Sequence, residues 1–369
     1  MDQEIYIGEG SISNLKRVVD RISPDSIFLL TGKESYELCG AKAVIDKILF
    51  DYKCFVFSDF ERNPRLEDAV RGIELLKENN CDLIIAVGGG SVMDMAKLVK
   101  ALFDSKDCSE AIKKSNVVPT DKKLIAIPTT SGTGSEATHF AVVYIDKVKY
   151  SLAHIDILPD VSINDSQFTY SQSAYLAAVT GFDAFAQAVE SLWSVNSTDE
   201  SVIDSMEAIR LVWSNLRAAV DGNHVAKDNM SRASFLAGKA INITKTTAPH
   251  ALSYSFTSYN NLPHGHAVAV SLPFFLEYNY NLTEYDCNDK RGVSYVRSVF
   301  EDLFEILEVK TIKEARFKLE MFIADIGIEI RLDNLGMTDK DVRFALDNIN
   351  LQRLTNNPRL VSKDIVLDL

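Results

Sequence analysis

The sequence contains no long apolar run. None of its hydrophobic stretches approaches the roughly 20 residues that a helix needs to cross a bilayer. The first ten residues, MDQEIYIGEG, also lack the basic segment and apolar stretch that are typical of a secretory signal peptide. Membrane and secreted proteins are therefore disfavoured, and we expect a cytoplasmic protein.

Cysteine is scarce and scattered. The five cysteines are far apart and form no CxxC pair: Cys39, Cys54, Cys81, Cys108 and Cys287. An odd, dispersed set fits reduced thiols in a cytosolic chain better than a disulfide framework. We therefore expect the fold to rest on its hydrophobic core, without covalent cross-links.

Positive charge is in deficit. Against 52 acidic residues the chain has 39 lysines and arginines, which gives a formal net charge of -13. This balance argues against a general affinity for nucleic acid or anionic membranes. It leaves room for a small anionic substrate, because a local basic pocket can lie inside an acidic protein.

Residues 1–163 alternate short apolar runs with amphipathic segments. The apolar runs are candidate strands: 26–31, a segment within 47–57, 82–87 and 123–128. Residues 66–79 instead place apolar side chains at helical spacing. Alternating strands and helices predict an α/β domain with a mostly parallel sheet covered on both faces.

Residues 164–369 have a different pattern, in which strand signals fade. Several segments have a hydrophobic period near 3.6: 171–193, 199–220, 226–243, 294–307, 311–326 and 338–349. This period predicts an all-helical second domain. Hydrophobic residues make up 46% of the chain and charged residues 25%, a balance typical of a globular enzyme.

Three glycines and a serine, Gly88 to Ser91, follow the candidate strand 82–87 and precede a helix. Glycines let a backbone approach an anion, and the N–H groups of a helix N-terminus point at it. The segment is neither the GxGxxG fingerprint nor a Walker A loop. A phosphate site and a merely tight turn both remain open for this segment alone.

A second polar loop, residues 128–136, follows the candidate strand 123–128 and reads PTTSGTGSE. Taken alone, it is equally well explained as a surface loop in which Ser135 caps a helix. Parallel strands end at one sheet edge, however, where open α/β sheets bind ligands. The two loops together therefore predict a nucleotide site.

The helical half contains a candidate metal site. Asp183 lies in a helical pattern and Gln187 is four residues further, on the same helix face. His250 and His264 each follow a proline. A carboxylate with imidazoles suits Fe²⁺ or Zn²⁺, and an incomplete protein set leaves a position for substrate oxygen. The ordinary alternatives are a solvated helix aspartate and two turn histidines.

Four segments resemble motifs of the iron-containing (group III) alcohol dehydrogenases. They are residues 88–97 (GGGSxxDxAK in the family), 127–136 (IPTTxGTGSE), 180–184 (TGxDA) and 263–265 (PHG). His250 precedes His264 by fourteen residues, the separation that the family uses between two liganding histidines. The resemblance extends to residues 356–359 and so covers essentially the whole chain.

This resemblance implies a dehydroquinate synthase-like fold. The α/β dinucleotide-binding domain would span 1–163, and the all-helical metal- and substrate-binding domain 164–369. The implied cofactor contacts are Gly88, Gly89, Gly90, Ser91, Asp94, Thr129, Thr130, Gly132, Thr133 and Lys149. The implied ligands of Fe²⁺ or Zn²⁺ are Asp183, His250 and His264.

The chain departs from the family pattern at two positions. The usual first liganding histidine is Gln187 here, and an amide oxygen binds Fe²⁺ or Zn²⁺ more weakly than imidazole. A further active-site histidine of the family is Tyr254 here, which would face the nicotinamide and help to move a proton. His266 is a second candidate for proton transfer.

The loop after the strand at 26–31 bears on the choice of cofactor. NAD-preferring relatives often have an aspartate there, which binds the ribose hydroxyls and repels a 2′-phosphate. Here Gly32 removes that repulsion, while Lys33 and Ser35 can bind phosphate. Glu34 can instead serve the ribose. We predict that NADP(H) is preferred over NAD(H).

Lys245 and three threonines stand just upstream of His250. A cation with hydroxyl donors beside a reacting carbonyl suits an anionic tail. This stretch, with residues 263–267, resembles the phosphonoacetaldehyde reductase branch, which makes 2-hydroxyethylphosphonate in phosphonate biosynthesis. The competing interpretation of Lys245 is a surface lysine at a helix end.

We therefore predict a metal-assisted, NAD(P)H-dependent reduction of an aldehyde to a primary alcohol, with phosphonoacetaldehyde as the favoured substrate. One alternative is a general short-chain alcohol dehydrogenase or aldehyde reductase of the same family. Another is a metal-free, degenerate nucleotide-binding relative, which the glutamine at position 187 would favour. Neither nucleic acid nor membrane is an expected partner, and a homodimer remains open.

Overall fold

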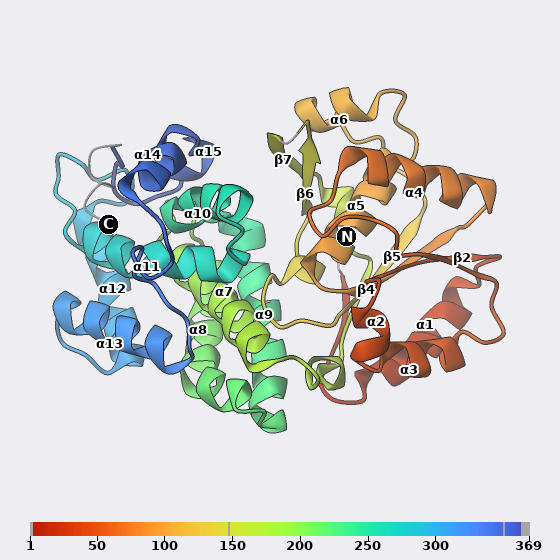
Figure 1. Ribbon diagram of the computed structural model, residues 1–369, viewed down its shortest axis with the longest axis horizontal. Helices are drawn as coiled ribbons and strands as arrows, with labels where there is room; N and C mark the ends of the chain where they lie inside the picture. The colour runs from red at the N-terminus through yellow and green to blue at the C-terminus, as the bar shows by residue number, and fades with distance from the viewer. Residues whose placement is uncertain (1–2, 147, 350, 363–369) are drawn as a thin grey trace. The chain divides into compact units, whose positions relative to one another are not determined.

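A computed structural model describes residues 3–146, 148–349 and 351–362 of the chain (Figure 1). The chain divides into two compact units, Met1–Gln172 and Ser173–Leu369. The boundary expected at residues 163/164 falls inside a strand, Val161–Asn164, which is hydrogen-bonded on both sides and therefore remains with the first unit. Within the described residues, no helix is both long and apolar enough to span a bilayer.

The first unit is built on a six-stranded parallel sheet, as the sequence predicts. Its strand order is β1-β8-β5-β4-β2-β3. The strands are β1 (Glu4–Ile7), β2 (Ile27–Thr31), β3 (Cys54–Phe57), β4 (Leu83–Gly88), β5 (Lys123–Pro128) and β8 (Val161–Asn164). Every pairing in this sheet is parallel.

Helices cover both faces of the sheet, which is why its central strands are apolar along most of their length. Phe28 and Leu30 of β2 pack on the face covered by α4 (Leu66–Glu78) and α5 (Gly90–Leu102). Ile27 and Leu29 pack on the opposite face, against α1 (Asn14–Ile22) and α3 (Ala41–Ile48) (Figure 1). Strand side chains alternate between faces, so burial of both requires a continuous hydrophobic run.

The first unit also contains an antiparallel pair, β6 (Phe140–Ile145) and β7 (Val148–Ala153). The helices α2 (Ser35–Leu38) and α6 (Cys108–Lys114) complete its regular α-helical segments among the described residues. In the register of the pair, Tyr144 lies opposite Lys149. The pair matters for the site because it carries Lys149.

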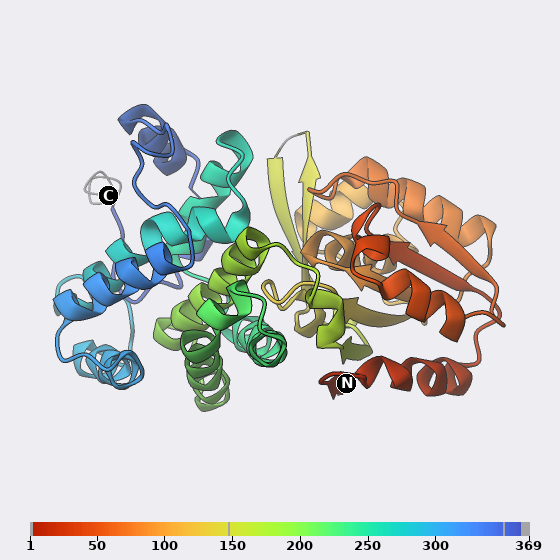
Figure 2. The ribbon, with the colours of Figure 1, turned by 60° about the horizontal axis from the view of Figure 1, so that its bottom comes forward.

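The second unit is helical, as predicted, and its central helix is α7 (Ala174–Trp193). Its other helices are α8 (Asp199–Val220), α9 (His224–Thr244), α10 (Ala248–Tyr259), α11 (His264–Tyr280), α12 (Val293–Leu307), α13 (Ile312–Asp325), α14 (Asp339–Asp347) and α15 (Leu351–Leu354). Helices α8 and α9 pack along α7 (Figure 2). Every residue of α7 from Gly181 to Trp193 is buried, so this helix has no solvent-facing stripe there.

Helices α10 and α11, like the short α15, are absent from the sequence-based prediction. Helix α11 is buried along most of its length and contains Pro273, so its apolar residues have no clear period. Helix α10 has a proline, Pro249, in its first turn, where a missing N–H is tolerated. Both helices matter here, because they carry the two candidate liganding histidines.

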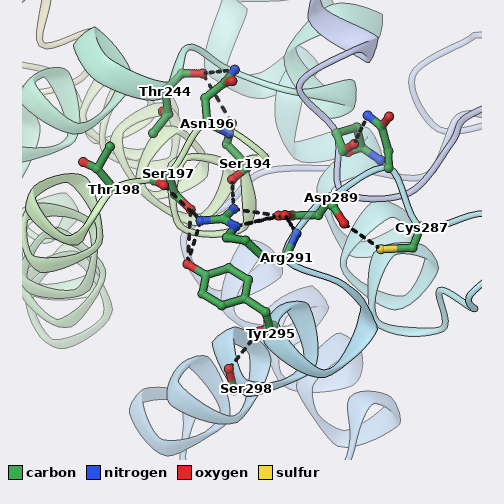
Figure 3. Close-up of polar contacts among 12 residues, drawn as sticks. Ser194, Asn196, Ser197, Thr198, Thr244, Cys287, Asp289, Arg291, Tyr295 and Ser298 are labelled. Atoms are coloured by element: carbon green, nitrogen blue, oxygen red, sulfur yellow. Dashed lines mark hydrogen bonds and ion pairs between the residues drawn. The ribbon is translucent and has the colours of Figure 1, made fainter.

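The end of α7 is fixed by Arg291 (Figure 3). Its guanidinium donates to the carbonyls of Ser194 and Ser197, both at 2.9 Å, and pairs with the carboxylate of Asp289 at 2.6 Å. The Asp289 side chain is only 1% exposed, so this pairing compensates a buried charge. The α7–α8 turn is thereby held against the segment that precedes α12.

Gly265, in the first turn of α11, lies directly against α7. A Cβ at this position would be 1.9 Å from the carbonyl oxygen of Val179, which is a backbone atom and cannot rotate away. Only glycine therefore lets the start of α11 approach α7 this closely. At Gly181, by contrast, a Cβ would meet the flexible ends of Leu216 and Met230.

We predict that Gly265→Ala lowers the free energy of unfolding by about 3 kcal/mol, because the added methyl group forces two backbones apart. Gly181→Ala is the matched control, since it adds the same methyl group to a buried glycine of a helix. Its loss should be about 1 kcal/mol, because side-chain ends can yield. Urea titration of both variants checks this, and an equal loss would contradict the backbone argument.

Candidate functional site

Three loops of the first unit meet at one sheet edge. Thr31 of β2 pairs with Val87 of β4, and Gly88 of β4 pairs with Pro128 of β5, so these strands end at the same level. The segments that follow them contain residues 32–35, 88–91 and 129–135. The polar and glycine-rich segments singled out in the sequence are therefore neighbours in space, at the edge where open α/β sheets bind ligands.

The glycines after β4 allow the loop after β5 to pack on them. A Cβ at Gly89 would lie 3.2 Å from Oγ1 of Thr130, and one at Gly90 would lie 2.9 Å from Cγ2 of Thr133. Gly89 is also the N-cap of α5, and Ser91 is half-buried in its first turn. The structure thus brings the two loops together at a helix N-terminus, a position that favours anions.

Asp94 and Lys97 of α5 hold the loop after β5 in place. The Asp94 carboxylate accepts from Oγ of Ser135 at 3.0 Å and from the backbone N–H of Val142 at 3.2 Å. The Lys97 ammonium is fully buried and donates to Oγ of Ser135 and Oγ1 of Thr138, both at 2.9 Å. In this arrangement both side chains organise the loop.

Burial also shifts the pKa values of Lys97 and Asp94. Burial lowers the pKa of Lys97 to about 8, against the opposing effect of Asp94 and Glu136. It raises the pKa of Asp94, while the positive charges of Lys97 and Lys149 act in the opposite direction. The charge of Lys149 thus acts on Asp94, and its predicted contact with the cofactor stays a prediction.

Gly32, Lys33 and Ser35 follow β2 at the same sheet edge. A Cβ at Gly32 would lie 2.0 Å from Oγ of Ser35, so the glycine makes room for that hydroxyl. The Lys33 ammonium lies 3.8 Å from the carboxylate of Asp59, with both side chains largely exposed. Such a surface pair is weak, so Lys33 can exchange this partner for another anion.

The second unit brings three of the predicted ligands together. One donor atom from each of Asp183, His250 and His264 lies within 4.8 Å of the others. Nε2 of His250 is 3.2 Å from Oδ1 of Asp183, and Nε2 of His264 is 3.9 Å from it. A divalent ion bound at about 2.1 Å separates adjacent ligand atoms by roughly 3.0–3.4 Å. The His250–Asp183 spacing falls in this range, and the His264–Asp183 spacing is about 0.5 Å longer.

Gln187 contacts Asp183 and has an unsatisfied oxygen. Its Nε2 donates to Oδ2 of Asp183 at 3.1 Å, while its buried Oε1 has no hydrogen-bond partner among the described residues. A buried amide oxygen without a partner is costly. An orphaned oxygen donor beside a carboxylate and two imidazoles fits a divalent metal ion, which accepts oxygen and nitrogen ligands.

Glu190 is a site residue that the sequence analysis missed. It is fully buried on α7 and contacts Nδ1 of His250. The signal was its position seven residues after Asp183, which places it two turns further along the same helix face. Burial lowers the pKa of His250, but the carboxylates of Glu190 and Asp183 outweigh burial and raise it to about 10 in the metal-free chain.

Tyr254 contacts the candidate ligand His264, whereas the hydrogen-bond partners of His266 are other residues. The Tyr254 ring stacks on the ring of His264 with centroids 5.9 Å apart. His266 instead has both ring nitrogens engaged, with the Tyr175 hydroxyl at 2.8 Å and the Glu329 carbonyl at 2.6 Å. A carbonyl only accepts, so Nε2 carries the hydrogen and Nδ1 accepts. Both ring nitrogens of His266 therefore have partners within the second unit, and its role in proton transfer stays a prediction.

Lys245 is exposed at the end of α9. The neighbouring Thr244 is 2.9 Å from Oγ of Ser191, which lies eight residues along α7 from Asp183. Eight residues of helix span about 12 Å. Lys245 is thus outside the immediate ligand set, and only its extended side chain, about 6 Å long, can approach a group attached to a substrate there.

Two sequence profiles match this chain. The profile described as "Iron-containing alcohol dehydrogenase" matches residues 2–166, and that described as "Fe-containing alcohol dehydrogenase family, C-terminal" matches residues 177–369. Among similar proteins, long-chain-alcohol dehydrogenase 1 of Geobacillus thermodenitrificans is 31% identical, over 95% of this chain and 89% of its own. Phosphonoacetaldehyde reductase of Streptomyces viridochromogenes is also 31% identical, over 82% of this chain and 78% of its own.

A solved structure has the same fold. The crystal structure of sulfoacetaldehyde reductase from Bifidobacterium kashiwanohense in complex with NAD+ superposes with a TM-score of 0.86. It is 26% identical in sequence, and the match covers 99% of this chain and 95% of that one. The predicted α/β and helical architecture is confirmed by this similarity.

Glu136, beside Lys97, gives the nucleotide loops a pH-dependent stability. Burial raises the pKa of Glu136 to about 7, whereas the charge of Lys97 lowers it. Because the folded pKa exceeds the unfolded value of 4.5, folding binds a proton between these limits. The associated stability is present below about pH 4.5 and is lost as pH rises through 7.

We predict that Glu136→Gln, which keeps the shape without the charge, is more stable than the wild type at pH 8, by at most about 3 kcal/mol. The difference should disappear towards pH 5, where the wild-type carboxyl is protonated. Urea titrations at pH 5, 6, 7 and 8 test this. The exposed Glu74→Gln is the control, and parallel curves for the wild type and Glu136→Gln would refute the prediction.

Proposed function

Because the chain belongs to the iron-containing alcohol dehydrogenase family, it is an NAD(P)-dependent alcohol and aldehyde oxidoreductase, and we propose that its metal ligands are Asp183, Gln187, His250 and His264. The observation that carries this proposal is the convergence of three donor atoms next to Gln187, whose amide nitrogen bonds Asp183 and whose buried Oε1 has no partner among the described residues. When bound, Fe²⁺ or Zn²⁺ supplies a Lewis acid for a carbonyl oxygen.

The side chains around this set hold and protonate the substrate. Reduction adds a hydride from the dihydronicotinamide to the carbonyl carbon and a proton to the oxygen. Tyr254, whose ring lies on that of His264, is the residue to which we assign the proton. We do not assign it to His266, because both ring nitrogens of that residue have other partners.

The three loops of the first unit bind the cofactor in this proposal. The backbone of residues 88–91 at the start of α5 faces the pyrophosphate. Thr129, Thr130, Gly132 and Thr133 serve the ribose and nicotinamide, together with Lys149. Asp94 contributes by fixing the loop after β5. Gly32, Lys33 and Ser35 favour the 2′-phosphate of NADPH, since the partner of Lys33 is a weak surface pair.

For the substrate we propose a short aldehyde with an anionic tail, of which phosphonoacetaldehyde is the first candidate. The reductase from Streptomyces viridochromogenes carries that name, and the sulfoacetaldehyde reductase is named for another anionic aldehyde. In this chain Lys245 supplies the positive charge. Among the described residues no acidic group lies within ion-pair distance of its ammonium, so it is available to an anion.

We predict that reduction of phosphonoacetaldehyde requires added Fe²⁺ or Zn²⁺ and proceeds better with NADPH than with NADH. His264→Ala should lower kcat/KM by at least about 100-fold, because it removes an imidazole ligand, and Gln187→Ala by about 10-fold. NADPH oxidation by chelator-treated protein, with and without metal, measures both effects. Full activity of the chelated protein would refute the metal centre, and cofactor binding without turnover of any aldehyde would indicate the degenerate relative.

Lys245 permits a second test because its backbone is strained. With φ 59° and ψ 176° it occupies a region that glycine alone adopts readily, at a cost of about 1–3 kcal/mol. Lys245→Ala and Lys245→Gly both remove the ammonium, so both should raise KM for phosphonoacetaldehyde about 10-fold and leave butanal unchanged. Only Lys245→Gly should raise stability. Equal changes in KM for the two aldehydes would contradict the proposal that Lys245 binds an anionic substrate.

A further inference from the structure

Glu190 has a less accessible carboxylate than the candidate ligand Asp183, and both of its oxygens have hydrogen-bond partners. Its side chain is 0% exposed. One oxygen, Oε2, accepts from the backbone N–H of Thr247 at 2.6 Å and from Oγ1 of the same residue at 2.9 Å. The other oxygen, Oε1, contacts Nδ1 of His250. An isolated buried carboxylate would be very costly, so these contacts together account for its presence.

The direction of each hydrogen bond in this chain follows from its chemistry. The indole N–H of Trp193 only donates, and it donates to Oγ1 of Thr247 at 3.0 Å. The hydroxyl of Thr247 must then use its own hydrogen for Glu190. A carboxylate only accepts, so Nδ1 of His250 carries a hydrogen. With Nδ1 committed in this way, Nε2 is the atom that His250 turns towards Asp183.

We propose that Glu190 is a positioning residue of the metal centre, which holds the His250 ring so that Nε2 faces the other ligands. This inference rests on the proposed metal site. A carboxylate behind a liganding imidazole fixes the ring orientation and increases the electron donation of the nitrogen that binds the metal. Glu190 therefore acts on the ion through His250, without contacting it.

Helices α7 and α10 place the residues of this arrangement next to one another. Asp183, Gln187 and Glu190 occupy positions i, i+4 and i+7 of α7 and so share one helix face. Thr247 is the N-cap of α10, and His250 is the third residue of that helix. By binding Thr247 and His250 together, Glu190 fixes both the start of α10 and the ring that α10 presents. The face of α7 that supplies two ligands thus also supports a third.

A purely structural role for Glu190 predicts lost stability with unchanged metal binding, so metal affinity is the deciding measurement. Glu190→Gln keeps the shape but places an amide donor against either Nδ1–H of His250 or the two donors of Thr247. We expect the dissociation constants for Zn²⁺ and Co²⁺ to increase 10- to 100-fold, which means weaker binding. The full chain, freed of metal, would be titrated against a chromophoric chelator well below its melting temperature. The absorption bands of bound Co²⁺ should also shift.

Two matched controls separate positioning from general damage. Asp289→Asn alters another buried carboxylate of the same unit, paired with Arg291 (Figure 3), and should lower the melting temperature without changing metal affinity. Thr247→Val removes the hydroxyl that supports Glu190 and should weaken metal binding 3- to 10-fold. Thr247→Ser retains the hydroxyl and should bind the metal as tightly as the wild type.

The outcomes distinguish the two proposals. If the wild-type chain binds neither Zn²⁺ nor Co²⁺, the metal centre itself is wrong and the role of Glu190 falls with it. If the wild type binds them and Glu190→Gln binds equally tightly, only the positioning role is overturned. Should Glu190→Gln fail to fold, the comparison of Thr247→Val with Thr247→Ser decides, and equal affinities for that pair overturn the proposal.

Discussion

The burial of polar groups on α7 is the constraint on which the candidate site depends. Asp183, Gln187 and Glu190 lie on one face of a helix that is buried from Gly181 to Trp193. Water cannot satisfy groups placed there, so each must find a partner of fixed geometry. Thr247 and His250 provide those partners for Glu190, whereas Oε1 of Gln187 has none in the part of the chain that the structure describes. The most buried part of the second unit is therefore also its chemically most specific part.

The first unit follows a different principle, in which the backbone positions the site. Parallel strands with covered faces end at one edge, and this register alone brings the loops after β2, β4 and β5 together. Asp94 and Lys97 then fix the loop after β5 through hydrogen bonds to side chains and backbone. Asp94, which the family motif marks as a cofactor contact, thus shapes a neighbouring loop in this structure.

Much of this organisation could be predicted from the sequence, because the strands are apolar runs and most helices have a regular period. Asp183, His250 and His264 were found by their motifs and spacing, and the structure brings them together. Glu190 was not found, since a glutamate on a helix is ordinary until its burial and its contact with His250 are known. Helices α10 and α11 were missed for a related reason. Helix α11, for example, is buried along most of its length and interrupted by Pro273, which leaves no clear hydrophobic period.

Gly265 shows how packing limits the ways in which this chain can vary. Because its missing Cβ leaves room for the carbonyl oxygen of Val179, the position next to His264 has no freedom to accept another residue. Tyr254 stacks on the other side of His264 and is only partly buried. Libraries aimed at new substrates should therefore diversify position 254 and leave 265 unchanged. Positions 254 and 265 both lie next to His264, but the packing leaves room for substitution at position 254 and none at position 265.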